Sequence, residues 1–195
     1  MAKHNELICQ RLEDSIMVKN KITSDDNLKK NISNLADTVV NAISNGNKIV
    51  ICGNGGSASD ALHFAGEIVG RFETERNPWP AIVLNSDVAT MTAIANDYGY
   101  DEIYARQAKG HIKHGDVFIG ITTSGNSKNI IRAVETSAKI GAITAALTGT
   151  KGGSIAAIVD YPIVVDSSVT ARIQEAHICI IHILCEIIEK EMGKK

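Results

Sequence analysis

The sequence predicts an α/β fold, a three-layer αβα sandwich in which helices cover both faces of a five-stranded parallel sheet. Five short apolar runs are each bounded by Gly, Asn, Asp or Ser, and they lack the strict alternation of strands that have one solvated face. Helical stretches separate several of these runs, and alternation of strands with helices is typical of parallel sheets. The predicted strands are 48–52, 81–85, 116–122, 142–148 and 161–166.

Two amphipathic helices are predicted before the first strand. Apolar residues have roughly helical spacing over residues 8–22 and again over 28–43. Capping residues at 24–26 precede the second helix, and Asn45-Gly46 ends it. Further helices are predicted at 57–72, 128–140 and 171–189.

Length and composition suit a single domain. The chain has 195 residues, of which 44% are hydrophobic, and this is enough to build a full core. We expect residues 1–195 to form one domain, with the leading helices (about 1–46) packed on the α/β core and in oligomer contacts. The net charge of −2 gives no reason to attract a polyanion, so small-molecule chemistry is expected rather than nucleic-acid binding.

No segment of the sequence suggests export or membrane insertion. Residues 1–21 carry scattered charges instead of the apolar core of a secretory signal, and no apolar run approaches about 18 residues. We therefore expect a cytoplasmic protein without membrane contact. The cysteines form no CxxC pair and are expected to be buried, reduced thiols. They are Cys9, Cys52, Cys179 and Cys185.

Two loops that follow predicted strands could bind phosphate. The first, Gly53-Asn54-Gly55-Gly56-Ser57, joins a strand to a helix; glycines permit a sharp turn there, and free amides at a helix start attract anions. The second loop precedes the helix that begins near residue 128, and its hydroxyls can donate to phosphate oxygens without any positive charge. Its hydroxyl residues are Thr122, Thr123, Ser124 and Ser127.

The same two loops bear on the kind of ligand. Either loop alone could be an ordinary Gly/Ser turn, whereas two together, each after a buried strand, favour a phosphorylated ligand. The first loop is not GxGxxG, and no Gly-Lys-Ser/Thr follows it. A nucleotide cofactor is therefore not expected.

Three groups of polar residues could move protons or hold a metal. His63 and Glu67 are four residues apart on the helix after the first loop, so they share a face, although such pairs are more often solvated than catalytic. The apolar terminal helix carries Gln174 and His182. A core histidine bonded to a carbonyl is the ordinary interpretation of His182. The third group is Asn96-Asp97, which turn chemistry alone would explain.

The motifs GNGGSASDALHFAGEIVGRF, AIANDYGYDEIYARQ, TTSGNSKN and ARIQEAHICIIHILC closely resemble the phosphoheptose isomerases of the SIS domain family. The resemblance spans nearly the whole chain and implies a flavodoxin-like fold. It implies a cytoplasmic homotetramer that converts sedoheptulose 7-phosphate into D-glycero-D-manno-heptose 7-phosphate through an enediol. Such a reaction would serve activated-heptose synthesis for bacterial lipopolysaccharide or capsule.

The resemblance also implies roles for particular residues. It places catalysis on Glu67 and His182, and a bound zinc on His63, Glu67, Gln174 and His182. On a straight helix, however, Gln174 and His182 are separated by about 12 Å and about 80° of rotation. Either the helix starts irregularly near Gln174, or a long side chain and a neighbouring subunit complete the site. The implied substrate-binding residues are Asn54, Gly55, Gly56, Ser57, Glu67, Asn96, Asp97, Thr122, Thr123, Ser124, Ser127 and Gln174.

Two other functions remain open on the sequence. Some single-domain SIS proteins are non-catalytic tetrameric scaffolds that bind the bacterial replication initiator. The presence of His63, Glu67, Gln174 and His182 argues for an enzyme instead. The other alternative is a SIS isomerase or sensor of a hexose or amino-sugar phosphate.

Overall fold

The five predicted strands form one sheet in the computed structural model, which describes residues 3–194. The strands stand in the order β2-β1-β3-β4-β5, and every neighbouring pair is parallel. This confirms the predicted α/β architecture. The strands are β1 (Ile49–Gly53), β2 (Ala81–Val83), β3 (Val117–Thr122), β4 (Ile143–Thr148) and β5 (Tyr161–Val164).

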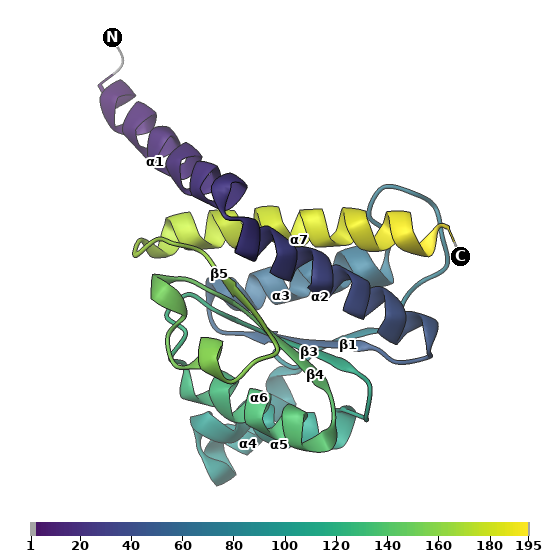
Figure 1. Cartoon of the computed structure of the whole chain (residues 1–195). Helices are drawn as coiled ribbons and strands as arrows, with labels where there is room; N and C mark the ends of the chain where they lie inside the picture. Colours follow the sequence, from purple (N-terminus) through teal and green to yellow (C-terminus); the bar gives the residue numbers. More distant parts are fainter. Residues whose placement is uncertain (1–2, 195) are drawn as a thin grey trace.

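Helices cover both faces of the sheet (Figure 1). On one face α2, α3 and α7 pack over the side chains of Ile49 and Ile51, and on the other α4, α5 and α6 pack over Val50 and Cys52. All residues of β1 and β3 are buried, which explains their unbroken apolar runs. The helices are α1 (Asn5–Ser24), α2 (Asp26–Ser44), α3 (Gly56–Val69), α4 (Val88–Tyr98), α5 (Ile103–His111), α6 (Lys128–Ile140) and α7 (Thr170–Met192).

Parallel pairing determines where the polar loops meet. In the register of β1 against β3, Gly53 lies opposite Ile121, so the two strands end side by side. Thr122 in turn lies opposite Thr148 of β4. The loops that follow β1 and β3 therefore leave the same edge of the sheet, as expected for carboxyl ends of parallel strands.

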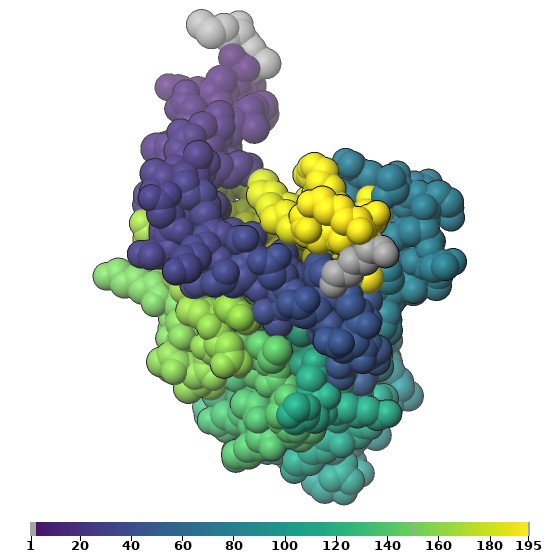
Figure 2. Space-filling view, turned by 45° about the vertical axis from the view of Figure 1, so that its right-hand side comes forward, coloured from purple at the N-terminus to yellow at the C-terminus, as the bar shows by residue number. Residues whose placement is uncertain are grey.

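The two leading helices differ in how they are covered. Helix α2 packs on the sheet and is capped by Asp25, whose Oδ1 accepts from the Leu28 amide at 2.9 Å. Helix α1 stands away from the body (Figures 1 and 2). Five of its large apolar side chains are more than half exposed, so the predicted apolar stripe is buried only at its C-terminal end, where Val18 and Ile22 reach the core. The five exposed side chains are Leu7, Ile8, Leu12, Ile16 and Met17.

Three sequence-based expectations need correction. The prediction of buried cysteines is wrong for Cys9, which is exposed because it lies on α1, and Cys179 is only partly buried; Cys52 and Cys185 are buried. The predicted strand 81–85 ends at residue 83, and the Asn85 side chain instead accepts from the Gly53 amide at 3.1 Å. The helices between β2 and β3 were not predicted as separate elements. Among the helices described, none is both long and apolar enough to cross a bilayer.

Candidate active site

The loop between β1 and α3 requires its glycines. Gly55 has φ +56° and ψ −123°, a conformation that side-chain-bearing residues avoid. A Cβ on Gly53 would lie 2.2 Å from the Ser57 carbonyl oxygen. Helix α3 then starts without a side-chain cap, and the amides of Ser57 and Ala58 donate to the carbonyls of Asn54 and Gly55 at 3.1 and 3.0 Å, so an anion at this helix start would have to share these donors.

Asn54 joins this loop to the second one. Its side-chain amide and that of Asn129 on α6 donate to each other, both at 3.0 Å. The Tyr100 hydroxyl also donates to Asn54 Oδ1 at 3.0 Å. Asn129 and Tyr100 were not singled out in the sequence, because an asparagine at a helix start and a tyrosine in a turn are ordinary there. Asn54 therefore holds the two loops in register.

Hydroxyl groups converge in the loop between β3 and α6. The Oγ atoms of Thr122 and Ser127 are 2.9 Å apart, and the Oγ of Ser124 is 3.4 Å from that of Thr122. Ser127 precedes α6 without capping it, so its hydroxyl turns toward the loop. The Thr123 carbonyl accepts from the Gly149 amide at 3.1 Å and ties the loop to β4. Neutral donors thus gather beside the start of a helix.

The structure brings His63, Glu67 and His182 together. His63 Nε2 lies 3.0 Å from His182 Nε2 and 3.3 Å from Glu67 Oε1. Helices α3 and α7 pack side by side (Figure 1), and His63 and His182 meet between them. The side chains of His63 and Glu67 are 42% and 25% exposed, so a substrate can reach them.

The ordinary interpretation of a core histidine fits His177 rather than His182. His177 is fully buried, and its Nε2 is 3.1 Å from the Thr148 carbonyl oxygen. Burial lowers the pKa of His177 to about 4, against the opposing effect of that hydrogen bond. His182 instead contacts His63, and the Phe72 ring centroid lies 5.9 Å from its own.

Gln174 lies beside the first loop. A Cβ on Gly56 would lie 2.2 Å from Gln174 Nε2, so a larger residue there would force this glutamine side chain to shift. Helix α7 is continuous from Thr170 to Met192, so an irregular helix start near Gln174 is wrong. Within residues 3–194, no three His, Cys, Asp or Glu side chains are grouped so that they could hold a metal ion.

Asn96 and Asp97 lie at the end of α4 and apart from this cluster. They are exposed, and Asn96 Nδ2 donates to Asp97 Oδ1 at 2.9 Å. The helix ends at Gly99, whose φ of +90° marks the turn. Tyr100, just beyond, is the residue that reaches the first loop.

One further carboxyl lies next to the histidines. Asp60 precedes His63 by one helical turn and is partly buried, and its Oδ2 has no hydrogen-bond partner within the part of the chain described. Burial raises the pKa of Asp60, while the nearby His63 opposes the rise. Its spacing from His63 was the signal that could have revealed it.

The fold and these residues define a class. A parallel sheet carries two loops of amides and hydroxyls at its carboxyl edge, and a His/Glu cluster stands on the helix that one loop opens. Such a site is suited to proton transfer on a phosphorylated small molecule.

Comparisons with known proteins place the chain in that class. The SIS domain model matches residues 17–149. "Phosphoheptose isomerase 2" from Campylobacter jejuni is 48% identical over 100% of this chain and 97% of its own length. The phosphoheptose isomerase from Aneurinibacillus thermoaerophilus is 46% identical over 95% of this chain and 94% of its own.

Solved structures agree with the sequence comparisons. A phosphoheptose isomerase from Neisseria gonorrhoeae superposes with a TM-score of 0.89 at 38% identity, covering 95% of this chain and 98% of that one. One from Francisella tularensis has a TM-score of 0.89 at 39% identity, covering 95% and 97%. The chain belongs to the SIS domain family and, within it, to the phosphoheptose isomerases.

Proposed function

We propose that this protein is an aldose–ketose isomerase that converts sedoheptulose 7-phosphate into D-glycero-D-manno-heptose 7-phosphate, a step toward activated heptose for the bacterial envelope. The observation that carries the proposal is the contact of His182 with His63, 3.0 Å apart, with Glu67 3.3 Å from His63. This cluster stands on the helix that the first phosphate loop opens. The relatives named phosphoheptose isomerase support the choice of a heptose substrate.

The two loops would hold the phosphate. Amides at the start of α3 and the hydroxyls of Thr122, Ser124 and Ser127 are neutral donors at the ends of neighbouring strands. Gln174, beside Gly56, lies within this region and would contact the sugar. The family resemblance adds Asn96 and Asp97 as further sugar contacts. Binding through neutral groups suits a chain with a net charge of −2.

Interconversion of an aldose and a ketose moves a proton between C1 and C2 through a cis-enediol. It needs one group near both carbons and another near the two oxygens. We assign the carbon proton to the Glu67 carboxylate, and ring opening and the oxygen proton to His182. The contact with His63 orients the His182 ring. The reverse assignment of the two roles is the alternative.

We further propose that one zinc ion per subunit is held by His63, Glu67, His182 and Gln174, with Gln174 supplied by a neighbouring subunit, because on the continuous helix α7 it lies about 12 Å from His182 of its own chain. Two ligands of a tetrahedral zinc at about 2.0–2.1 Å are about 3.3 Å apart. The separations of His63 from His182 and from Glu67, 3.0 and 3.3 Å, are of this size, but within residues 3–194 the three side chains do not yet form a metal-binding group, so they would have to close around the ion. When bound, zinc would polarise the substrate carbonyl and stabilise an enediolate.

Assembly is part of the same proposal. We propose a cytoplasmic homotetramer with one domain, residues 1–195, per subunit and without nucleic-acid or membrane partners. The exposed apolar side chains of α1, such as Leu12 at 60% and Ile16 at 56%, support contact with other copies. A neighbouring subunit could then complete the site.

Parallel incubations test the function. The protein would be mixed with sedoheptulose 7-phosphate, fructose 6-phosphate and glucosamine 6-phosphate, with and without a chelator, and the products separated by chromatography. We expect sedoheptulose 7-phosphate to be converted, and to be converted faster than the other two sugar phosphates. No turnover of the heptulose, together with retention of a replication initiator in a pull-down, would instead identify a non-catalytic scaffold.

A further inference from the structure

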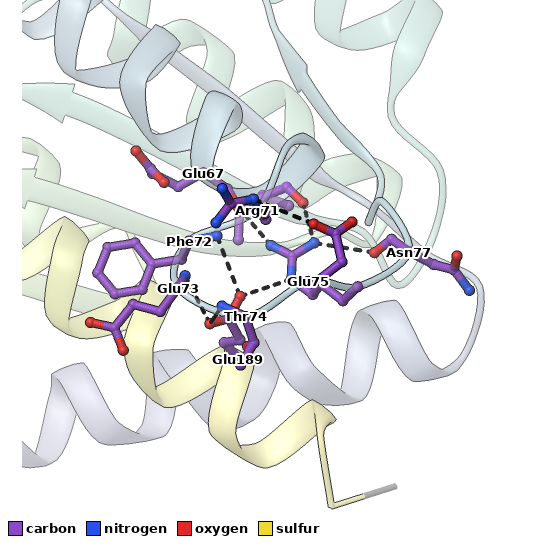
Figure 3. Close-up of polar contacts among 10 residues, drawn as sticks. Glu67, Arg71, Phe72, Glu73, Thr74, Glu75, Asn77 and Glu189 are labelled. Atoms are coloured by element: carbon purple, nitrogen blue, oxygen red, sulfur yellow. Dashed lines mark hydrogen bonds and ion pairs between the residues drawn. The ribbon is translucent and has the colours of Figure 1, made fainter.

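A buried ion pair anchors the segment that follows α3. Arg76 Nε donates to Glu189 Oε1 on α7 at 3.1 Å, and the two side chains are only 11% and 8% exposed. Figure 3 shows Glu189 below the loop that carries Phe72, Glu73 and Thr74. The Arg76 guanidinium also stacks on Trp79, 3.5 Å from the ring centroid. Burying an ion pair costs free energy unless the remaining donors and acceptors of both side chains are hydrogen-bonded. The groups that bond to Arg76 and Glu189 therefore indicate what the pair does.

Glu189 binds the backbone of the loop. Its Oε1 accepts from the Phe72 amide at 3.3 Å, and its Oε2 accepts from the amides of Glu73 and Thr74 at 3.0 and 2.9 Å. Burial works to raise the pKa of Glu189, but the bonds from Thr74, Glu73 and Arg76 lower it to about 2. The carboxylate is therefore a permanent anchor for three consecutive loop residues.

Arg76 binds the end of α3. Its NH2 group donates to the carbonyl oxygen of Glu67 at 2.7 Å, and NH1 donates to that of Ile68 at 3.0 Å. These carbonyls belong to the last turn of α3, where helical partners are missing. A positive charge is also favourable at a helix C-terminus. Arg76 thus holds the peptide unit of Glu67 itself.

We infer that Arg76 and Glu189 are positioning residues that set the spacing between Glu67 and His182. This inference rests on the proposed isomerase function. Glu189 lies seven residues after His182 on α7, so both point to the same side of that helix. The Glu67 carboxylate is directed away from the ion pair, so the pair acts through the helix end (Figure 3). The Phe72 ring, next to His182, is held through its own amide.

The position of the pair predicts a specific kinetic effect. The pair grips the last turn of α3, whereas the phosphate loop lies at the first turn, about 20 Å away for 14 residues. A loosened pair should therefore misplace the proton-transfer groups and leave phosphate binding intact. The expected result is a lower kcat with an unchanged KM.

The test compares Arg76→Met and Arg76→Lys with the control Lys48→Met. Lys48 also makes a buried ion pair, with Asp116 at 2.5 Å, but this pair joins the amino ends of β1 and β3 and does not link α3 to α7. For Arg76→Met we expect kcat for sedoheptulose 7-phosphate to fall at least about 10-fold, since displacements near 1 Å are costly. KM and the inhibition constant of inorganic phosphate should stay within about twofold. Arg76→Lys should be intermediate, because one ammonium cannot reach all four acceptors of the guanidinium, which are Glu189 and the carbonyls of Glu67, Ile68 and Asn77.

The control separates positioning from general stability. Lys48→Met should lower the melting temperature while kcat stays within about twofold of the parent. Parent-like kcat in a folded Arg76→Met protein, or equal losses in Lys48→Met, would overturn the inference. If Arg76→Met does not fold, Arg76→Lys and Glu189→Gln decide by the same criterion. Turnover by the parent is measured first, because its absence would overturn the proposed function rather than the positioning role.

Discussion

His63 on α3 and His182 on α7 place their Nε2 atoms 3.0 Å apart, although 119 residues separate them in the chain. At this distance one ring Nε2 can donate a hydrogen bond to the other, and the tautomers of the two imidazoles decide which one donates. The contact forms because both helices pack on the same face of the sheet. The contact therefore places two histidines that look ordinary in the sequence where both can act on the same ligand.

Glu67 should be essential for turnover. Glu67→Gln keeps the size of the side chain but removes the base, and we expect kcat to fall at least about 100-fold, the usual scale of acid–base assistance. Product formation from sedoheptulose 7-phosphate measures this loss. Glu135→Gln, an exposed glutamate on α6, is the matched control and should keep parent activity. Near-normal turnover by Glu67→Gln would remove this residue from the mechanism.

Removal of metal should abolish most activity. We expect dialysis against a chelator to lower kcat about 100-fold, since a Lewis acid contributes several kcal/mol, and added zinc to restore it. His63→Gln should lower the zinc content of the purified protein, measured by atomic emission, as well as its activity. Full activity in protein shown to be metal-free would contradict the zinc proposal.

Two glycines in α3 provide a direct test of the Gln174 contact. In Gly56→Ala the new methyl group would lie 2.2 Å from Gln174 Nε2, so the glutamine must move, and kcat/KM should fall about 10-fold or more. In Gly66→Ala nothing lies within 4 Å of the new methyl group. That variant should gain about 0.5–1 kcal/mol of unfolding free energy from helix propensity. Equal activities of the two variants would argue against a role for Gln174.

His177 should make stability depend on pH in a defined window. Its pKa is about 4 in the folded protein, against an ordinary 6.5, so only the unfolded chain binds the proton between these values. The contribution of neutral His177 to the free energy of unfolding is fully present above pH 6.5. It is lost as the pH falls toward 4, which lowers that free energy by about 3 kcal/mol. Urea denaturation at pH 7, 5.5 and 4.5 measures the slope.

A variant isolates the contribution of His177. In His177→Leu the slope between pH 6.5 and 4 should be shallower, because the titrating group is gone. The Thr148 carbonyl keeps a partner, the Val165 amide at 2.8 Å, so this bond does not confuse the comparison. Identical slopes in the parent and the variant would show that another group dominates acid unfolding.

Local patterns were sufficient for most of the fold. Each strand must bury both of its faces, and α2 and α7 must each bury one apolar stripe, whatever they pack against. These patterns can therefore be recognised in each segment separately. The loops after β1 and β3 could be recognised for the same reason, because glycines and hydroxyls serve a turn and an anion locally. The bounds of β2 were less legible, since three residues are a weak signal.

The partners of individual side chains could not be predicted in this way. His177 and His182 are five residues apart in one apolar helix, yet one is buried against Thr148 and the other reaches His63. Arg76 and Glu189 read as ordinary surface charges in sequence, and only the packing of α3 against α7 makes them a buried pair. Contacts between distant segments depend on how helices are arranged around the sheet, and no local pattern encodes that.

The sequence by itself determined the class of fold, the two glycine- and hydroxyl-rich loops that we propose bind phosphate, and the residue types available for proton transfer, because each depends on local backbone and burial requirements. The tertiary structure alone decided that His63, Glu67 and His182 meet, that Gln174 lies against Gly56, and that Arg76 grips the end of α3. The physical reason is that catalytic geometry is set by distances between elements, and those distances exist only once the helices have packed on the sheet.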